Sequence, residues 1–151
     1  MPLSKRYQKE LHLLYNLQLN KKLDYNIEVI DFTENNVVIY MELIGKILLE
    51  LDIQISKYFP FQKPTLTINN IDYIEYLHID PKFYDRFNIN ICPCCSSILC
   101  SNNWACSYKF TDILEEVNKN FQLKIRIMQL RYCNKIVDKY FGFYVPIDEF
   151  I

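Results

Sequence analysis

Most of the cysteines lie in one short stretch of the chain, and cysteine thiolates act both as nucleophiles and as metal ligands. The stretch contains Cys92, Cys94, Cys95, Cys100 and Cys106. Cys92 and Cys95 form a Cys-x-x-Cys pair that Cys100 and Cys106 would complete as a tetrathiolate zinc site, with His78 as a substitute ligand. A second arrangement leaves Cys95 free and uses Cys92, Cys94, Cys100 and Cys106 as the metal ligands.

Spacing alone does not choose between three roles for these thiols. A zinc-bound Cys95 cannot also be a free nucleophile, so the two chemical roles exclude each other at that position. The third role is that of small buried hydrophobic side chains. Cys133 lies on the apolar pattern of the last predicted helix, and we expect it in the core.

Composition and charge exclude several classes of function. Gly45 and Gly142 are the only glycines, so the chain has no glycine-rich phosphate-binding loop. The formal net charge of −1 argues against a nucleic-acid-binding or polybasic membrane-anchoring role. No apolar run is long enough to span a bilayer, and residues 1–9 lack the apolar region of a secretory signal. We therefore expect a reducing compartment, the cytoplasm or the nucleus.

The sequence predicts a single α+β domain over residues 4–151, whose helices and strands surround the cysteines. Ser4 is a candidate N-cap for a helix whose apolar residues recur every three or four positions, and residues 20–24 end it. Period-two alternation then predicts four strands with short spacers, which favour an antiparallel meander. The predicted strands are Asn26–Phe32, Val37–Ile44, Ile47–Ile55 and Thr65–Ile68.

Regular patterning is weak from Asn69 to Asn103, as expected of a functional or metal-stabilised segment. Helical spacing returns after it in two apolar stripes, which predict C-terminal helices, followed by an aromatic tail, Phe141–Ile151. The first stripe is Phe110, Ile113, Leu114, Val117 and Phe121, and the second is Leu123, Ile127, Leu130, Val137 and Tyr140. The chain is rich in Ile, Asn, Lys and Tyr, a bias typical of AT-rich genomes such as those of some protists and large DNA viruses.

This order of elements resembles that of the ubiquitin-conjugating enzymes, and three patches of sequence strengthen the resemblance over about residues 4–121. Lys5–Leu11 is similar to the family's opening helix, and Tyr58–Ile68 to its Tyr-Pro-Phe segment before the fourth strand. Cys95-Ser-Ser-Ile98-Leu99, followed by Trp104 and by Asp112-Ile-Leu, resembles the family's active-site region. Residues 122–151 would be a C-terminal helix and tail.

The resemblance implies a single ubiquitin-conjugating-enzyme-like (UBC-like) domain that transfers ubiquitin or a ubiquitin-like modifier by trans-thioesterification. Cys95 takes the position of the nucleophile, because Ile98 and Leu99 follow it at the family's offsets. The transfer itself requires no cofactor, and this interpretation allows a structural zinc in residues 92–106, the cysteine segment.

The implied partners are the modifier, its activating enzyme and a ligase, with neither nucleic acid nor membrane among them. By the same matching, Lys5, Arg6 and Lys9 on the first helix would meet the activating enzyme. Phe61 and the Trp104-Ala105 turn would lie where ligases dock.

The chain departs from the family's pattern around the nucleophile. It lacks the His-Pro-Asn tripeptide, whose Asn helps to stabilise the oxyanion, and Asn88 and Asn90 are the nearest substitutes. Trp104 sits one residue later than in the family, and the turn after it has no proline.

The first hypothesis is an active carrier with Cys95 as nucleophile. The second is an inactive scaffold or protein-binding module with a zinc-stabilised cysteine segment, and a third is an unrelated α+β zinc module.

The remaining polar residues have ordinary structural interpretations. His12 and His78 are expected to be surface or structural histidines. Trp104 is expected to be a packing anchor. Glu115 and Glu116 are expected on a solvated face of a helix.

Overall fold

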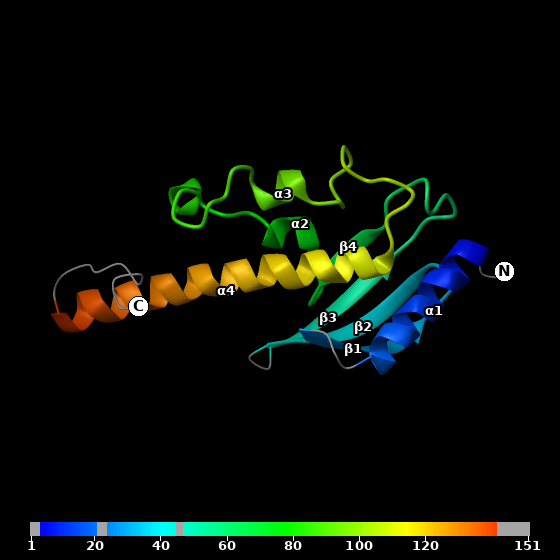
Figure 1. Cartoon of the computed structure of the whole chain (residues 1–151), viewed down its shortest axis with the longest axis horizontal. Coiled ribbons are helices and arrows are strands. Elements are labelled where there is room, and N and C mark those ends of the chain that lie inside the picture. Colours follow the sequence, from blue (N-terminus) through cyan, green and yellow to red (C-terminus); the bar gives the residue numbers. More distant parts are fainter. Residues whose placement is uncertain (1–3, 21–23, 45–46, 142–151) are drawn as a thin grey trace.

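The computed structural model describes residues 4–20, 24–44 and 47–141, with side chains described up to residue 130. It is an α+β fold with an N-terminal helix, an antiparallel sheet and a long C-terminal helix (Figure 1). The elements are α1 (Lys5–Leu19), β1 (Tyr25–Phe32), β2 (Asn36–Leu43), β3 (Ile47–Gln54), β4 (Thr65–Ile68), β5 (Ile71–Asp72), α2 (Tyr73–Tyr76), the 3-10 turn η1 (Pro81–Phe83), α3 (Pro93–Ser96) and α4 (Phe110–Phe141).

The strands form one sheet in sequence order, β1 to β5, and every neighbouring pair is antiparallel. The predicted meander is confirmed, but the prediction of four strands is wrong because β5 adds a fifth. Asn69 and Asn70 both have positive φ, 51° and 67°, and connect β4 to β5. Asparagine tolerates this left-handed conformation, which suits a two-residue hairpin loop. A two-residue strand is too short to leave an alternation in the sequence.

One face of the sheet carries the main core. On β3, Leu49, Leu51 and Ile53 are buried while Leu48 is 60% exposed, as the alternation predicts. The register places Leu51 opposite Ile39 of β2, so that inward-facing side chains meet across the strands. The buried side of α1 and the first turns of α4 pack into the same cluster.

The C-terminal helices of the prediction are one continuous helix, α4. No glycine or proline interrupts residues 110–141, so nothing in the backbone ends the helix between the two apolar stripes. The first stripe belongs to the main core. Ile127 and Leu130 of the second stripe pack with Ile79 and Phe83 in a smaller cluster of their own, the distal cluster. Figure 1 shows α4 running past the end of the sheet beneath the segment that contains α3.

Some predictions lie outside the described residues. These are the tail from residue 142 onward and the side chain of Cys133, whose backbone is part of α4. Among the described helices, none combines the length and apolar character required to cross a membrane.

Candidate functional site

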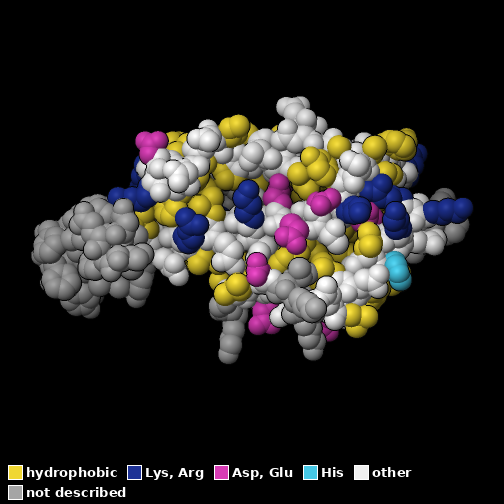
Figure 2. Space-filling model, viewed as in Figure 1, with side chains coloured by type: hydrophobic (Ala, Val, Ile, Leu, Met, Phe, Trp, Pro, Cys, Tyr) yellow, Lys and Arg dark blue, Asp and Glu magenta, His cyan; other side chains and the backbone are white. Residues whose placement is uncertain are grey.

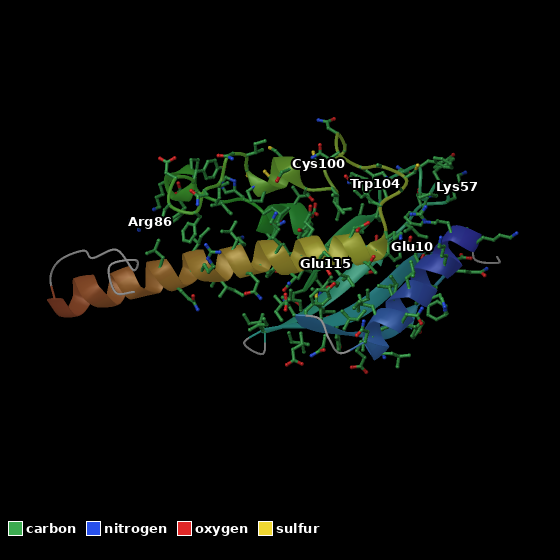
Figure 3. The ribbon with its side chains drawn as sticks, in the orientation of Figure 1. Glu10, Lys57, Arg86, Cys100, Trp104 and Glu115 are labelled. Carbon is green, nitrogen blue, oxygen red and sulfur yellow. The ribbon has the colours of Figure 1, made fainter. Side chains whose placement is uncertain are left out.

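The cysteine segment is fastened to α4 through one carboxylate, that of Glu116. Glu116 accepts hydrogen bonds from the Ser97 hydroxyl (2.7 Å), the Ile98 backbone N–H (2.8 Å) and the hydroxyl of the buried Tyr73 (3.0 Å). The expectation of a solvated face is therefore wrong for Glu116. It holds for Glu115 in part, because Glu115 is exposed yet accepts a hydrogen bond from Tyr25. Figure 3 labels Glu115 on α4.

Three thiols gather at the one-turn helix α3. Pro93 occupies the first helical position, where its missing N–H costs no hydrogen bond. The sulfur of Cys94 lies 2.8 Å from that of Cys92 and 3.8 Å from that of Cys95. Cys95 is exposed, Cys92 and Cys94 are half-buried, and Cys94 packs against the main core. None of the five described cysteines is buried, so none is a simple core side chain.

The pKa values of the Cys92 and Cys94 thiols shift in opposite directions. Burial alone would raise the pKa of the Cys92 thiol, but hydrogen bonds from Cys94 and Tyr84 outweigh burial and lower that pKa. The hydrogen bond to Cys92, followed by burial, raises the pKa of Cys94 to about 12. A separate hydrogen bond between the Tyr84 hydroxyl and Cys92 raises the pKa of that hydroxyl. Sequence reasoning missed Tyr84, because its contact depends on how an irregular segment folds back.

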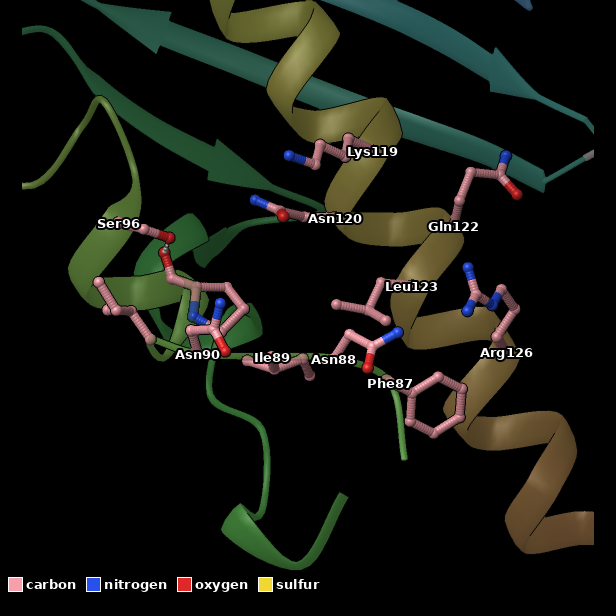
Figure 4. A pocket seen from close by; sticks show the side chains of 12 residues that line it. Phe87, Asn88, Ile89, Asn90, Ser96, Lys119, Asn120, Gln122, Leu123 and Arg126 are labelled. Carbon is pink, nitrogen blue, oxygen red and sulfur yellow. Dashed lines mark hydrogen bonds between the residues drawn. The ribbon is translucent and has the colours of Figure 1, made fainter. Parts of the chain in front are cut away.

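The asparagine next to Cys95 in space is Asn103. Its side-chain amide donates to the backbone carbonyls of Cys95 (2.7 Å) and Ser97 (3.0 Å), which fixes the end of α3. The predicted substitutes Asn88 and Asn90 instead line a cavity of about 540 Å³ between residues 87–96 and α4 (Figure 4). Cys95 is not part of that lining, whose opposite wall includes Lys119 and Arg126.

The predicted zinc ligands do not form a common site in this structure. Within the ranges that the structure describes, no group of three or more His, Cys, Asp or Glu side chains is arranged to hold a metal ion. Cys100 is half-buried and Cys106 is exposed, and the sulfur contacts at α3 are those among Cys92, Cys94 and Cys95. These four thiols therefore do not fit a tetrathiolate in this arrangement, and zinc binding stays a prediction.

The predicted ligase-docking residues come from two loops that the structure joins. The indole N–H of Trp104 donates to the carbonyl of Pro60 (2.8 Å), and the Trp104 ring packs against Tyr108. Phe61, next to Pro60, is 83% exposed, and Ala105 is also exposed. An exposed phenylalanine on an anchored loop is a typical interface residue.

The predicted basic face of α1 is divided between solvent and interior. Lys5 and Lys9 are exposed, and Figure 2 shows basic side chains gathered where α1 begins. Arg6 turns inward, where it pairs with the buried Glu10 (3.0 Å) and donates to the Tyr108 carbonyl (2.7 Å). Two of the three predicted basic contacts therefore remain available to a partner.

Comparisons with known proteins identify no relative. No protein-family model, no curated protein and no solved structure matches the chain.

Proposed function

We propose that this chain is a ubiquitin-conjugating-enzyme-like carrier that takes ubiquitin or a ubiquitin-like modifier as a thioester on Cys95. The observation that carries the proposal is the exposure of Cys95 at the end of a fixed segment. A carrier thiol must be reached by the activating enzyme and later by the acceptor amine, so it cannot be buried. The order of helix, meander, cysteine segment and C-terminal helix supports the same family.

In the proposed reaction, the Cys95 thiolate attacks the carbonyl carbon of the modifier's thioester and displaces the activating enzyme's thiolate. A lysine amine then attacks the new thioester, and Cys95 leaves as a thiolate. Glu116 and Asn103 act as positioning residues, because both bind the backbone around Cys95 rather than its thiol.

The proposed partner surfaces are the two that the resemblance implies. Lys5 and Lys9 on α1 would meet the activating enzyme, and Phe61 with the Trp104-Ala105 turn would meet a ligase. The hydrogen bond from Trp104 to Pro60 supports this assignment, because it holds the two ligase-facing loops against each other.

One observation favours the alternative of an inactive, protein-binding scaffold. The Asn103 side chain donates to two backbone carbonyls, and an amide nitrogen has only two hydrogens. Asn103 therefore has no donor left for an oxyanion. A scaffold would keep the partner surfaces without forming a thioester, and a structural zinc would belong to this alternative.

A thioester assay tests the proposal. The chain is incubated with activating enzyme, ATP and ubiquitin or a panel of ubiquitin-like modifiers, and products are separated without reductant. We expect an adduct that reductant removes, that Cys95→Ser abolishes or converts to a stable oxyester, and that Cys106→Ser preserves. Cys106 is the matched control because it is the other exposed cysteine in the described part of the chain.

Two results would contradict the assignment. No adduct with any modifier would favour the scaffold. An adduct that survives Cys95→Ser and disappears in Cys92→Ser would move the nucleophile to Cys92. Metal analysis of the same preparations tests the zinc prediction, which requires about one zinc per chain in the wild type and its loss in Cys92→Ser.

A further inference from the structure

The two closest thiols in the described part of the chain do not include that of Cys95, the proposed carrier residue. Cys92 and Cys94 have their sulfur atoms 2.8 Å apart, with only Pro93 between them in sequence. A disulfide bond brings two sulfurs to about 2.05 Å, and this pair is closer to that distance than Cys94 and Cys95 are. Both residues are half-buried, which leaves each sulfur partly accessible to a small reagent.

Neighbouring groups hold both side chains in this arrangement. The Cys92 sulfur contacts the backbone carbonyl oxygen of Leu77 at 4.0 Å. Cys94 packs against the main core. Two thiols that are held in contact have a high effective concentration toward each other, which favours a bond within the chain over one to a second small molecule.

Cys95 is a poorer partner for Cys94. Their sulfurs are 3.8 Å apart, and a bridge between sequence neighbours would close a small ring through a planar trans peptide. The sulfur contacts of this group are those among Cys92, Cys94 and Cys95. The pair with the favourable geometry is therefore Cys92 and Cys94, and Cys95 stays outside it.

We propose that Cys92 and Cys94 form a reversible dithiol–disulfide site that is oxidised by small disulfides such as glutathione disulfide. The Cys92 thiolate attacks one sulfur of the reagent, forms a mixed disulfide and releases one glutathione thiolate. The Cys94 thiol loses its proton to that thiolate and attacks the Cys92 sulfur, which releases the second glutathione. In sum, two protein thiols and one glutathione disulfide become one protein disulfide and two glutathiones.

The site is independent of the proposed carrier function, because Cys95 takes no part in it. It also differs from the zinc prediction, in which the sulfurs of Cys92 and Cys94 bind a metal ion instead of each other. The two roles are separable, since bound zinc would protect these thiols from oxidation.

The test equilibrates the full chain, freed of metal by a chelator and fully reduced, with glutathione disulfide in excess over glutathione. Free thiols are then blocked with N-ethylmaleimide and counted by mass spectrometry. We expect one disulfide within the chain, between Cys92 and Cys94, that reductant reverses and that leaves no glutathione on either residue. Glutathione retained on the exposed Cys95 or Cys106 is counted separately. Cys95→Ser and Cys106→Ser should form the disulfide as the wild type does. Cys92→Ser and Cys94→Ser should retain glutathione as a mixed disulfide instead.

Fragmentation of the oxidised wild type locates the bond without relying on a variant that folds. Trypsin should release residues 87–109 as one peptide, because it cleaves after Arg86 and Lys109. A bond between Cys92 and Cys94 encloses Pro93 alone, so backbone cleavage between Cys94 and Cys95 still separates two fragments. A bond between Cys94 and Cys95 prevents that separation.

Several outcomes would overturn the proposal. They are a bond that maps to Cys94 and Cys95, a loss of paired thiols that persists in Cys92→Ser, a glutathione adduct as the sole product in the wild type, and no oxidation at all. Isolation of the chain with about one zinc that protects Cys92 and Cys94 from oxidation would overturn it as well.

Discussion

At the scale of single residues, the cysteine segment depends on Glu116 more than on any cysteine. Its carboxylate is the shared acceptor for Ser97, Ile98 and Tyr73, which come from α2 and from the residues after α3. A hydrogen bond to a charged acceptor contributes about 1.5–3 kcal/mol, more than one between neutral groups. Glu116 therefore fixes the position of the backbone that follows Cys95.

Replacement of Glu116 tests this role. Glu116→Ala leaves the buried Tyr73 hydroxyl and the Ile98 N–H without this acceptor, and we expect the free energy of unfolding to fall by about 2–3 kcal/mol. Urea titration followed by circular dichroism measures it. Glu42→Ala is the matched control, because Glu42 is exposed on β2, and it should change stability by less than about 0.5 kcal/mol. Equal effects of the two substitutions would refute the anchoring role.

The sequence allowed part of the site to be predicted. The exposed thiol at position 95 and the exposed Phe61 follow from matched motifs. Tyr84, Asn103 and Glu116 were missed as site residues, because each contacts the segment through a fold that no periodicity describes. For Glu116 a signal existed. It follows Glu115 directly on the helix, so two successive acidic residues must point in directions about 100° apart, and one of them can turn inward.

At the scale of elements, patterns that repeat over several residues were predictive and single turns were not. The period-two runs of β2 and β3 fixed both their existence and their inward faces, because one shift in register would expose the whole apolar set. The one-turn helices α2 and α3 and the strand β5 are shorter than one useful period. The merger of the C-terminal helices follows from the absence of a helix breaker, which apolar stripes alone do not reveal.

The contact between α1 and α4 is also an element-scale feature, and it rests on a buried charge. Glu10 is 1% exposed, pairs with Arg6 and accepts the backbone N–H of Phe110 (3.0 Å), the first residue of α4. The carboxylate thus caps the N-terminus of α4, where negative charge is favourable, from a different helix.

Removal of the Glu10 carboxylate should weaken the contact between α1 and α4 and lower the stability of the fold. Glu10→Ala leaves the Phe110 N–H without its acceptor and Arg6 without its carboxylate partner, and we expect a loss of about 3–5 kcal/mol in the free energy of unfolding by guanidinium titration. Glu10→Gln should lose less, because its amide oxygen still accepts the N–H. Lys9→Ala, an exposed change on the same helix, should be near neutral. A near-neutral Glu10→Ala would show that the cap contributes nothing.

At the scale of the whole molecule, α4 connects two hydrophobic clusters of very different size. Leu114 belongs to the main core with α1 and the sheet, whereas Leu130 belongs to the distal cluster with Ile79, Phe83 and Ile127. A cluster of few buried side chains gains little free energy from burial, so it should open more often than the main core. The segment before Cys95 belongs to the distal cluster, because it contains Ile79 and Phe83.

Leu114 and Leu130 provide a matched pair for this prediction, because both are fully buried leucines on one helix. Leu114→Ala should lower the free energy of global unfolding by about 2–5 kcal/mol and reduce hydrogen-exchange protection throughout the chain. Leu130→Ala should increase exchange mainly in residues 79–89 and 120–130, while the sheet keeps its protection. Hydrogen–deuterium exchange with mass spectrometry measures both. If Leu130→Ala reduced protection in the sheet as much as Leu114→Ala, the two clusters would open as one cooperative unit, and the residues before Cys95 would have no independent opening.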